Sequence, residues 1–126
     1  MLITTIPQYV QGLKNSKVDL TATSATVVYT APAAADFNFS VVNSIIVSND
    51  SGSADTITLT ITGGGLTSAA AVSDHVFSLF QVKAVAANTS IELLTKDLIL
   101  QSGDILTATA ATANRLHVVA SIQELA

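Results

Sequence analysis

The stretch Thr56-Ile57-Thr58-Leu59-Thr60-Ile61-Thr62 decides the fold class of this chain. Apolar residues alternate with threonines without a fault, so a strand places Ile57, Leu59 and Ile61 on one face and the threonines on the other. Threonine is β-branched and suits the solvent face of a strand. The stretch therefore predicts a half-buried β-strand, and the polar face argues against a membrane span.

From residue 25 onward, turn residues separate further short strand-like stretches, and helical periodicity is almost absent. The predicted strands cover residues 26–30, 37–49, 56–62, 76–85, 90–95, 98–100, 105–110 and 115–123. Regular short strands with turns between them are typical of a β-sandwich or barrel. We predict an all-β fold: an antiparallel, jelly-roll-like β-sandwich of about seven or eight strands.

Two of these strands do not alternate cleanly. In residues 37–49 the apolar pattern is interrupted at Asn43, which predicts a β-bulge there. Parity places five apolar residues of that strand on one face: Phe37, Phe39, Val41, Ile45 and Val47. In residues 76–85, Phe77 and Phe80 have opposite parity, so either both faces are covered or a bulge intervenes.

The first twenty residues differ from the rest. We predict an N-terminal arm over residues 1–20, extended or mixed in structure because Pro7 interrupts any long helix, and a β-sandwich domain over residues 21–126. A frayed terminus is the alternative. If the arm packs against a neighbouring subunit or another partner, its apolar residues make the contact: Leu2, Ile3, Ile6, Tyr9, Val10 and Leu13.

Charge is scarce in this chain. Hydrophobic residues make up 49% and charged residues 11%, against roughly a quarter charged in typical soluble domains. A surface of threonine and serine can be buried against a partner without leaving unpaired charges in the interface. We therefore expect an obligate homo-oligomer. No apolar run is long enough for a spanning helix, and the N-terminus lacks the pattern of a secretory signal.

Composition also limits the ligands. Only five basic residues accompany a net charge of −4, so we expect no nucleic-acid binding. The chain has no cysteine, which excludes disulfides and Cys-based zinc sites. Its two histidines have no carboxylate pair nearby in sequence, so we predict no metal site and no cofactor.

No catalytic motif stands out. Ser73-Asp74-His75 has the residue types of a hydrolytic triad, but adjacent residues cannot aim at one another as a triad requires. His117 falls on the face opposite Leu116 and Val118, which indicates a surface or interface histidine. Four carboxylates are isolated in sequence: Glu92, Asp97, Asp104 and Glu124. We predict that the protein is not an enzyme.

Two loops invite a ligand interpretation. Residues 49–55 are rich in side-chain oxygen but lack the Glu that closes a calcium loop, so a hairpin loop is predicted. Gly63-Gly64-Gly65 follows a strand but lacks the later Gly-Lys of a phosphate-binding loop, so a flexible turn is predicted.

The order of segments from Val28 to Glu124 resembles small virion structural proteins of tailed bacteriophages. The resemblance covers about the last three-quarters of the chain. It is carried by Val28-Tyr29-Thr30-Ala31-Pro32-Ala33, residues 44–49, 57–61, 85–88, 98–100 leading into Gly103-Asp104, and 111–114. The resemblance implies an oligomeric β-sandwich on the capsid or tail, made in the host cytoplasm, and transfers no catalytic residue.

Within a virion, the resemblance leaves two placements open. One is a capsid decoration (cement) protein, expected as a homotrimer that binds the major capsid protein. The other is a tail or neck ring component. A carbohydrate- or receptor-binding module is an alternative of another class, although sugar sites usually need exposed aromatic platforms, and Tyr9 and Tyr29 are the only tyrosines.

Overall fold

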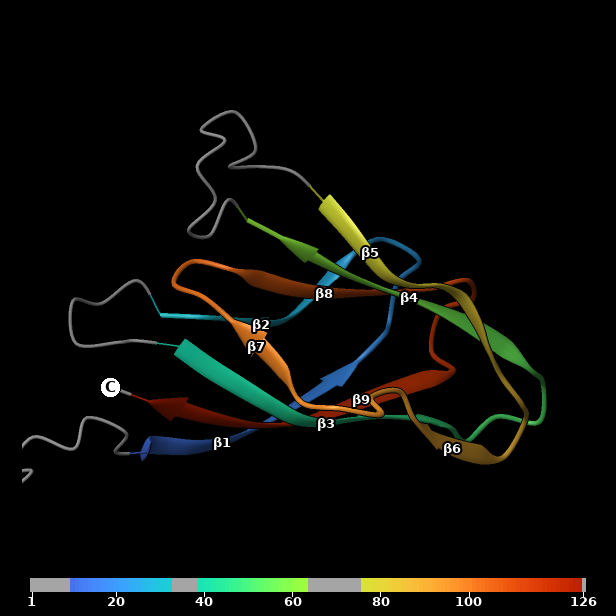
Figure 1. The fold of residues 1–126 in the computed structure, drawn as a ribbon. Helices are drawn as coiled ribbons and strands as arrows, with labels where there is room; N and C mark the ends of the chain where they lie inside the picture. The colour runs from blue at the N-terminus through green and yellow to red at the C-terminus, as the bar shows by residue number, and fades with distance from the viewer. Residues whose placement is uncertain (1–9, 33–38, 64–75, 126) are drawn as a thin grey trace, which may run out of the picture.

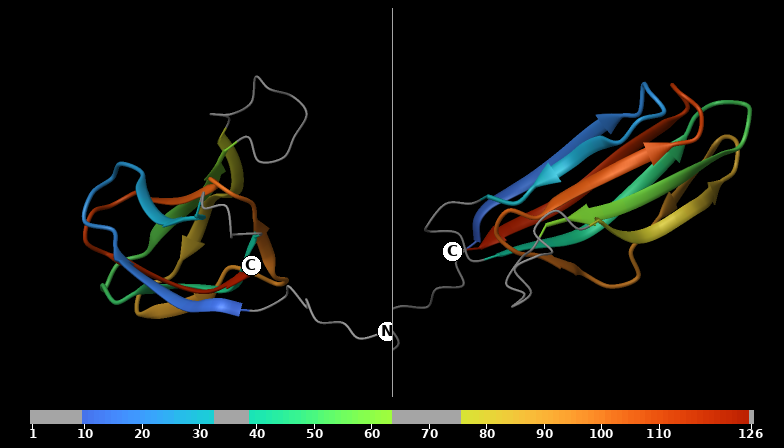
Figure 2. Two further views of the ribbon diagram at one scale, coloured as in Figure 1. Left: turned by 90° about the vertical axis from the view of Figure 1, so that its left-hand side faces the viewer. Right: turned by 90° about the horizontal axis from the view of Figure 1, so that it is seen from above.

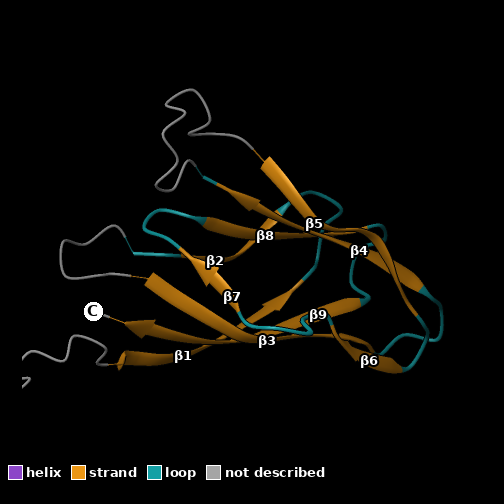
Figure 3. Ribbon diagram, in the orientation of Figure 1, coloured by secondary structure: helices purple, strands orange, loops and turns teal. Residues whose placement is uncertain are grey.

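In a computed structural model of the chain, the described residues are 10–32, 39–63 and 76–125. They form nine β-strands and no helix (Figures 1 and 3). The strands are β1 (Val10–Asp19), β2 (Thr26–Thr30), β3 (Phe39–Asn49), β4 (Asp55–Thr62), β5 (Val76–Val85), β6 (Thr89–Glu92), β7 (Leu98–Leu100), β8 (Ile105–Ala110) and β9 (Leu116–Leu125). Within these ranges no helix could cross a membrane.

The strands form two antiparallel sheets packed face to face (Figure 2). The first has the order β1-β9-β3-β6, with β7 pairing beside β6 on the same strand β3, and the second has the order β2-β8-β4-β5. With β6 and β7 counted as one interrupted strand, the first strand pairs with the last (β1 with β9) and the second with the second-last (β2 with β8). The pairing continues inward in the same way, to β4 with β5. This is a long hairpin rolled into two sheets, which is the jelly roll. The predicted fold class is confirmed.

Alternation along the strands builds the core. In β9 the residues Leu116, Val118, Ala120 and Ile122 are buried, and the residues between them are partly exposed. In β4, Ile57 and Leu59 are buried while the threonines stay on the outer face, as the sequence predicts. On that face the Thr60 and Thr107 hydroxyls share a hydrogen bond of 2.5 Å between β4 and β8. Apolar residues from both sheets thus form the core between them.

The first strand changes the predicted domain boundary. Val10–Asp19 pairs along its length with β9 and forms one edge of the first sheet. The predicted arm over residues 1–20 therefore does not hold for residues 10–19, which belong to the sandwich. The sequence obscured this strand because its apolar residues are few and unevenly spaced. Residues 1–9 lie outside the described part of the chain.

The bulge predicted near Asn43 is confirmed, since the register of β3 against β9 shifts between Val42 and Ser44. The bulge also corrects the predicted face. Val42 is buried together with Ile45 and Val47, whereas Phe39 and Val41 are partly exposed. The extra residue shifts the alternation. Before the bulge the even-numbered residues of β3 face the core, and after it the odd-numbered residues do.

The loop after β3 also differs from prediction. It is not a hairpin, because β3 and β4 lie in different sheets and the loop crosses between them. Asn49 organises the crossing: its Nδ2 donates to the carbonyls of Ser53 (2.8 Å) and Val85 (3.2 Å). Its Oδ1 accepts from the backbone N–H and the hydroxyl of Ser51, at 3.0 and 2.7 Å. The side-chain oxygens of this loop thus hold the loop itself.

Candidate functional site

Strand β5 is the open edge of the second sheet. Of its ten residues only Val85 is buried and only Phe80 is half-buried, and apolar side chains are exposed on both faces, including Val76 (55%), Leu79 (36%) and Val82 (56%). Among the described strands, β5 pairs only with β4. An edge strand with exposed apolar side chains, and with no second strand among the described ones beside it, favours association with another strand.

The backbone of β5 is irregular. Its register against β4 shifts on both sides of Leu59, which confirms a bulge in this strand. Val82 has a positive φ of 53°, and its N–H donates to the side-chain hydroxyl oxygen of Thr58 on β4, at 3.0 Å. The shifts explain why Phe77 and Phe80 have opposite parity. Within a single copy of the chain the faces of β5 are not covered, because most of the strand is exposed; coverage by a neighbouring copy stays a prediction.

A shallow hollow of about 290 Å³ lies where β5 meets the connection between β6 and β7. Leu79 and Phe80 line one side, and Leu93, Leu94 and Leu98 line the other. Lys96 and Asp97 are the two charged residues at this hollow, and their charges are opposite. The two sheets therefore leave an apolar opening along this edge.

The opposite edge of the molecule, formed by β1, is anchored by polar contacts. Glu124 of β9 is buried; its Oε2 accepts a hydrogen bond from the Tyr29 hydroxyl (2.5 Å) and lies 3.2 Å from Lys14 Nζ. The Tyr29 hydroxyl also contacts Ser40 Oγ at 2.7 Å. Tyr29 belongs to β2, so this cluster joins the two sheets. Burial, followed by the bond to Glu124, raises the pKa of Tyr29.

A second carboxylate fills the bulge of β3. Glu92 accepts hydrogen bonds from the Ser44 hydroxyl and from the backbone N–H groups of Ile45 (2.7 Å) and Leu94 (3.1 Å). Burial alone would raise the pKa of Glu92, but these three bonds lower it. The carboxylate thus satisfies one backbone donor beside the bulge, Ile45 N–H, and one on the connection between β6 and β7, Leu94 N–H.

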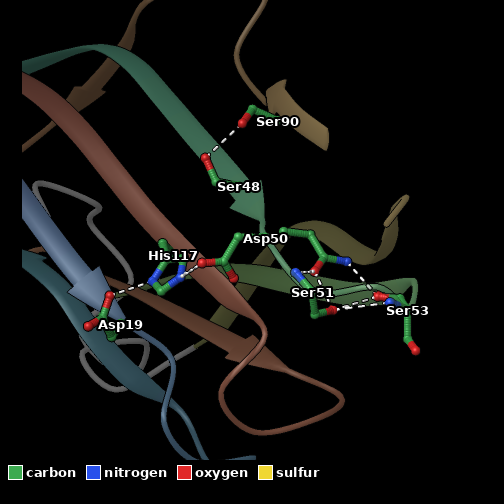
Figure 4. Close-up of polar contacts among 8 residues, drawn as sticks. Asp19, Ser48, Asp50, Ser51, Ser53, Ser90 and His117 are labelled. Atoms are coloured by element: carbon green, nitrogen blue, oxygen red, sulfur yellow. Dashed lines mark hydrogen bonds and ion pairs between the residues drawn. The ribbon is translucent and has the colours of Figure 1, made fainter. Parts of the chain in front are cut away.

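A polar corner lies where β1 and β3 end and β9 begins (Figure 4). His117 Nδ1 is 2.5 Å from Asp19 Oδ1, and its Nε2 is 3.1 Å from Asp50 Oδ2. Next to it, the hydroxyls of Ser48 and Ser90 are 2.8 Å apart. The bond to Asp19 raises the pKa of His117, burial lowers it, and Asp50 raises it, with a net rise.

The corner differs from the sequence interpretation in one respect. His117 does lie on the outer face, as predicted, but folding brings two carboxylates to it that are distant in sequence. The carboxylates bind opposite nitrogens of the ring, so the three side chains do not converge on one point (Figure 4). Over the described ranges, no group of three or more His, Cys, Asp or Glu is arranged to hold a metal ion.

The predicted contact residues are placed only in part. Val10 begins β1, and Leu13 projects from β1 with 76% of its surface exposed. The other four lie outside the described residues: Leu2, Ile3, Ile6 and Tyr9. The same holds for Ser73-Asp74-His75 and for Gly64 and Gly65. Sequence reasoning missed the open edge of β5 as a site, although its mixed parity was the available signal.

Comparison with known proteins gives little. No family model matches the chain, and no curated protein matches it. One solved structure, described as the structure of infectious bursal disease virus Gx strain, is similar to 92% of this chain and 42% of its own, at 9% identity and a TM-score of 0.35. The chain thus spans less than half of that protein, and a similarity at this level carries no functional argument.

Proposed function

We propose that the protein is a non-enzymatic structural subunit of a bacteriophage virion, a capsid decoration protein that self-associates through the open edge of β5 and binds the major capsid protein shell. The observation that carries the proposal is the exposure of apolar residues on both faces of β5. Monomeric soluble proteins rarely leave large apolar patches uncovered. The resemblance of residues 28–124 to small virion proteins supports the particle as the setting.

The occupant proposed for this edge is a second copy of the chain. Strand β5 contains no acidic residue and a single basic one, Lys83, so a neighbouring copy can cover this edge while burying few charges. The exposed apolar side chains of β5 can pack against a strand of a neighbour. The shortage of charge over the whole chain, 11% of residues, favours such coverage. In a closed ring such as the expected trimer, β5 of one copy would meet a different surface of the next copy, because such rings are built from heterologous contacts.

A tail or neck ring is the second placement within the same proposal, since β5 would serve a ring around the tail axis equally well. The carbohydrate-binding alternative receives less support. Tyr29 is buried against Glu124 and Ser40. A polar hollow of about 350 Å³ is lined by Ser48, Asn49, Asp50, Asn88, Thr89 and Ser90, with no aromatic platform among them.

Reconstitution tests the proposal. Particles produced without this protein are incubated with the purified chain and imaged, and bound density is located. Saturable binding to the capsid surface is expected; density on the tail or neck would replace decoration by the ring placement. A chain that binds neither head nor tail, while binding glycans saturably on an array, would overturn the structural role. A variant with Leu79→Asp serves as the self-association control, and Ile99→Asp, at an exposed apolar position of β7, is its matched partner.

A further inference from the structure

We propose that His117 and the carboxylates on either side of its ring form a proton-dependent latch that holds the end of β1 to the loop after β3. The three residues come from three separate parts of the chain. Asp19 is the last residue of β1, Asp50 directly follows β3, and His117 is the second residue of β9. This inference does not depend on the proposed function.

The geometry requires a particular protonation state. Nδ1 of His117 faces Asp19 at 2.5 Å, and Nε2 faces Asp50 at 3.1 Å (Figure 4). A neutral imidazole has one N–H and can donate to one carboxylate only; the second carboxylate then faces a lone pair. The imidazolium donates to both and offsets their charge. Both contacts therefore exist together only when the ring is protonated.

The surroundings offer few other charged groups. On β1, Lys17 precedes Asp19 by two residues and lies on the same face of the strand. On β3, the register partner of His117 is Ser48, which bonds to Ser90 of β6. Arg115 precedes His117 by two residues, but its Nη1 donates to the carbonyl of Ala54 at 3.0 Å. Within the described part of the chain neither cation forms an ion pair with the two carboxylates, so the imidazolium is the group placed to hold them.

The latch lies next to a corner of the core. Leu20, which follows Asp19, is fully buried; its N–H donates to the Leu116 carbonyl at 3.0 Å, and its carbonyl accepts from Asn114 N–H at 2.9 Å. Loss of the proton removes one of the two contacts of His117. We expect the corner to open more often in that state, because the end of β1 is then held by fewer contacts.

The sign of the pH dependence follows from the raised pKa of His117, whose main cause is the bond to Asp19. The stabilisation is fully present below the ordinary histidine pKa of 6.5 and is lost as the pH rises through the higher pKa of the folded protein. The latch is therefore closed at mildly acidic pH and opens toward alkaline pH. Because all three side chains are more than one-third exposed, salt weakens it.

A titration by nuclear magnetic resonance tests the latch. The chain has two histidines, so His75→Gln leaves His117 as the only imidazole. Its pKa is expected above 6.5, lower after Asp19→Asn or Asp50→Asn, and lowest in the double variant. Asp97→Asn, at an exposed position on the β6–β7 connection, is the matched control and should leave it unchanged. A pKa at or below 6.5, or one that neither substitution alters, would overturn the proposal.

Hydrogen exchange gives an independent readout in the unaltered chain. After correction for the intrinsic pH dependence of exchange, the protection of the Leu20 and Asn114 amides should fall as the pH passes the measured pKa of His117. In His117→Gln, protection should be low and independent of pH. If the two amides keep the same protection on both sides of that pKa, the imidazole is paired but does not act as a latch.

Discussion

Strands β4 and β5 are neighbours in the same sheet, and both are rich in apolar residues, yet they lie in very different surroundings. Ile57 and Leu59 of β4 are fully buried against the first sheet, whereas Val76, Leu79 and Val82 of β5 are exposed. The difference arises because the opposing sheet ends in the short strands β6 and β7, which leave β5 uncovered. An apolar strand is thus not automatically a core strand; what lies opposite decides it.

The largest difference between the two strands is expected in their contribution to folding. Leu59→Ala should lower the free energy of unfolding by about 3 kcal/mol, because it leaves a cavity in the core. Leu79→Ala should cost about 1 kcal/mol or less in the dissociated chain, since little packing is lost. Urea unfolding at low protein concentration measures both. Equal losses at the two positions would mean that β5 is covered within a single copy.

The two sheet edges provide the next comparison, because β1 is anchored and β5 is not. Tyr29→Phe removes the hydroxyl that bonds Glu124 and Ser40. We expect a loss on the order of 1–3 kcal/mol in unfolding free energy, because a buried carboxylate loses a hydrogen-bond donor. Denaturant unfolding checks this, with Val27→Ala on the exposed side of β2 as the control. An unchanged stability in Tyr29→Phe would show that the cluster does not anchor this edge.

A charge placed on the open edge should act on association rather than on folding. Leu79→Asp is expected to weaken self-association at least tenfold, about 1.4 kcal/mol, because the carboxylate would be buried without a partner. The matched change Ile99→Asp introduces the same charge at an exposed isoleucine of the other sheet and should leave association unchanged. Sedimentation of both variants over a concentration series distinguishes them. Equal weakening would point to a general effect of charge.

The smallest expected effect is at the polar corner. The parent protein should gain thermal stability as the pH falls from about 8.5 to about 6, since the raised pKa of His117 favours the protonated folded state. His117→Gln should reduce this gain by a modest amount, because the three side chains are exposed. Thermal melts at a series of pH values measure it. His75→Gln is the control, and an equal reduction there would remove the assignment to His117.

Much of the fold could be predicted because it depends on local alternation. The strands 26–30, 76–85, 98–100 and 105–110 have the predicted bounds, and the bulge near Asn43 is signalled by a break in parity. Strand β1 was missed because its pairing with β9 is satisfied by backbone groups, and backbone pairing leaves little trace in a polar sequence. Contacts such as Asp19 with His117, which join residues far apart in the chain, have no local signal at all.

Self-association of the chain through β5 is tested directly by the mass of the purified, unaltered protein, measured by light scattering at micromolar concentration. We expect a particle of about three times the mass of the 12.9 kDa chain, with Leu79→Asp shifting toward the single chain and Ile99→Asp remaining like the parent. A stable 12.9 kDa monomer throughout the concentration range, with β5 still exposed, would contradict it.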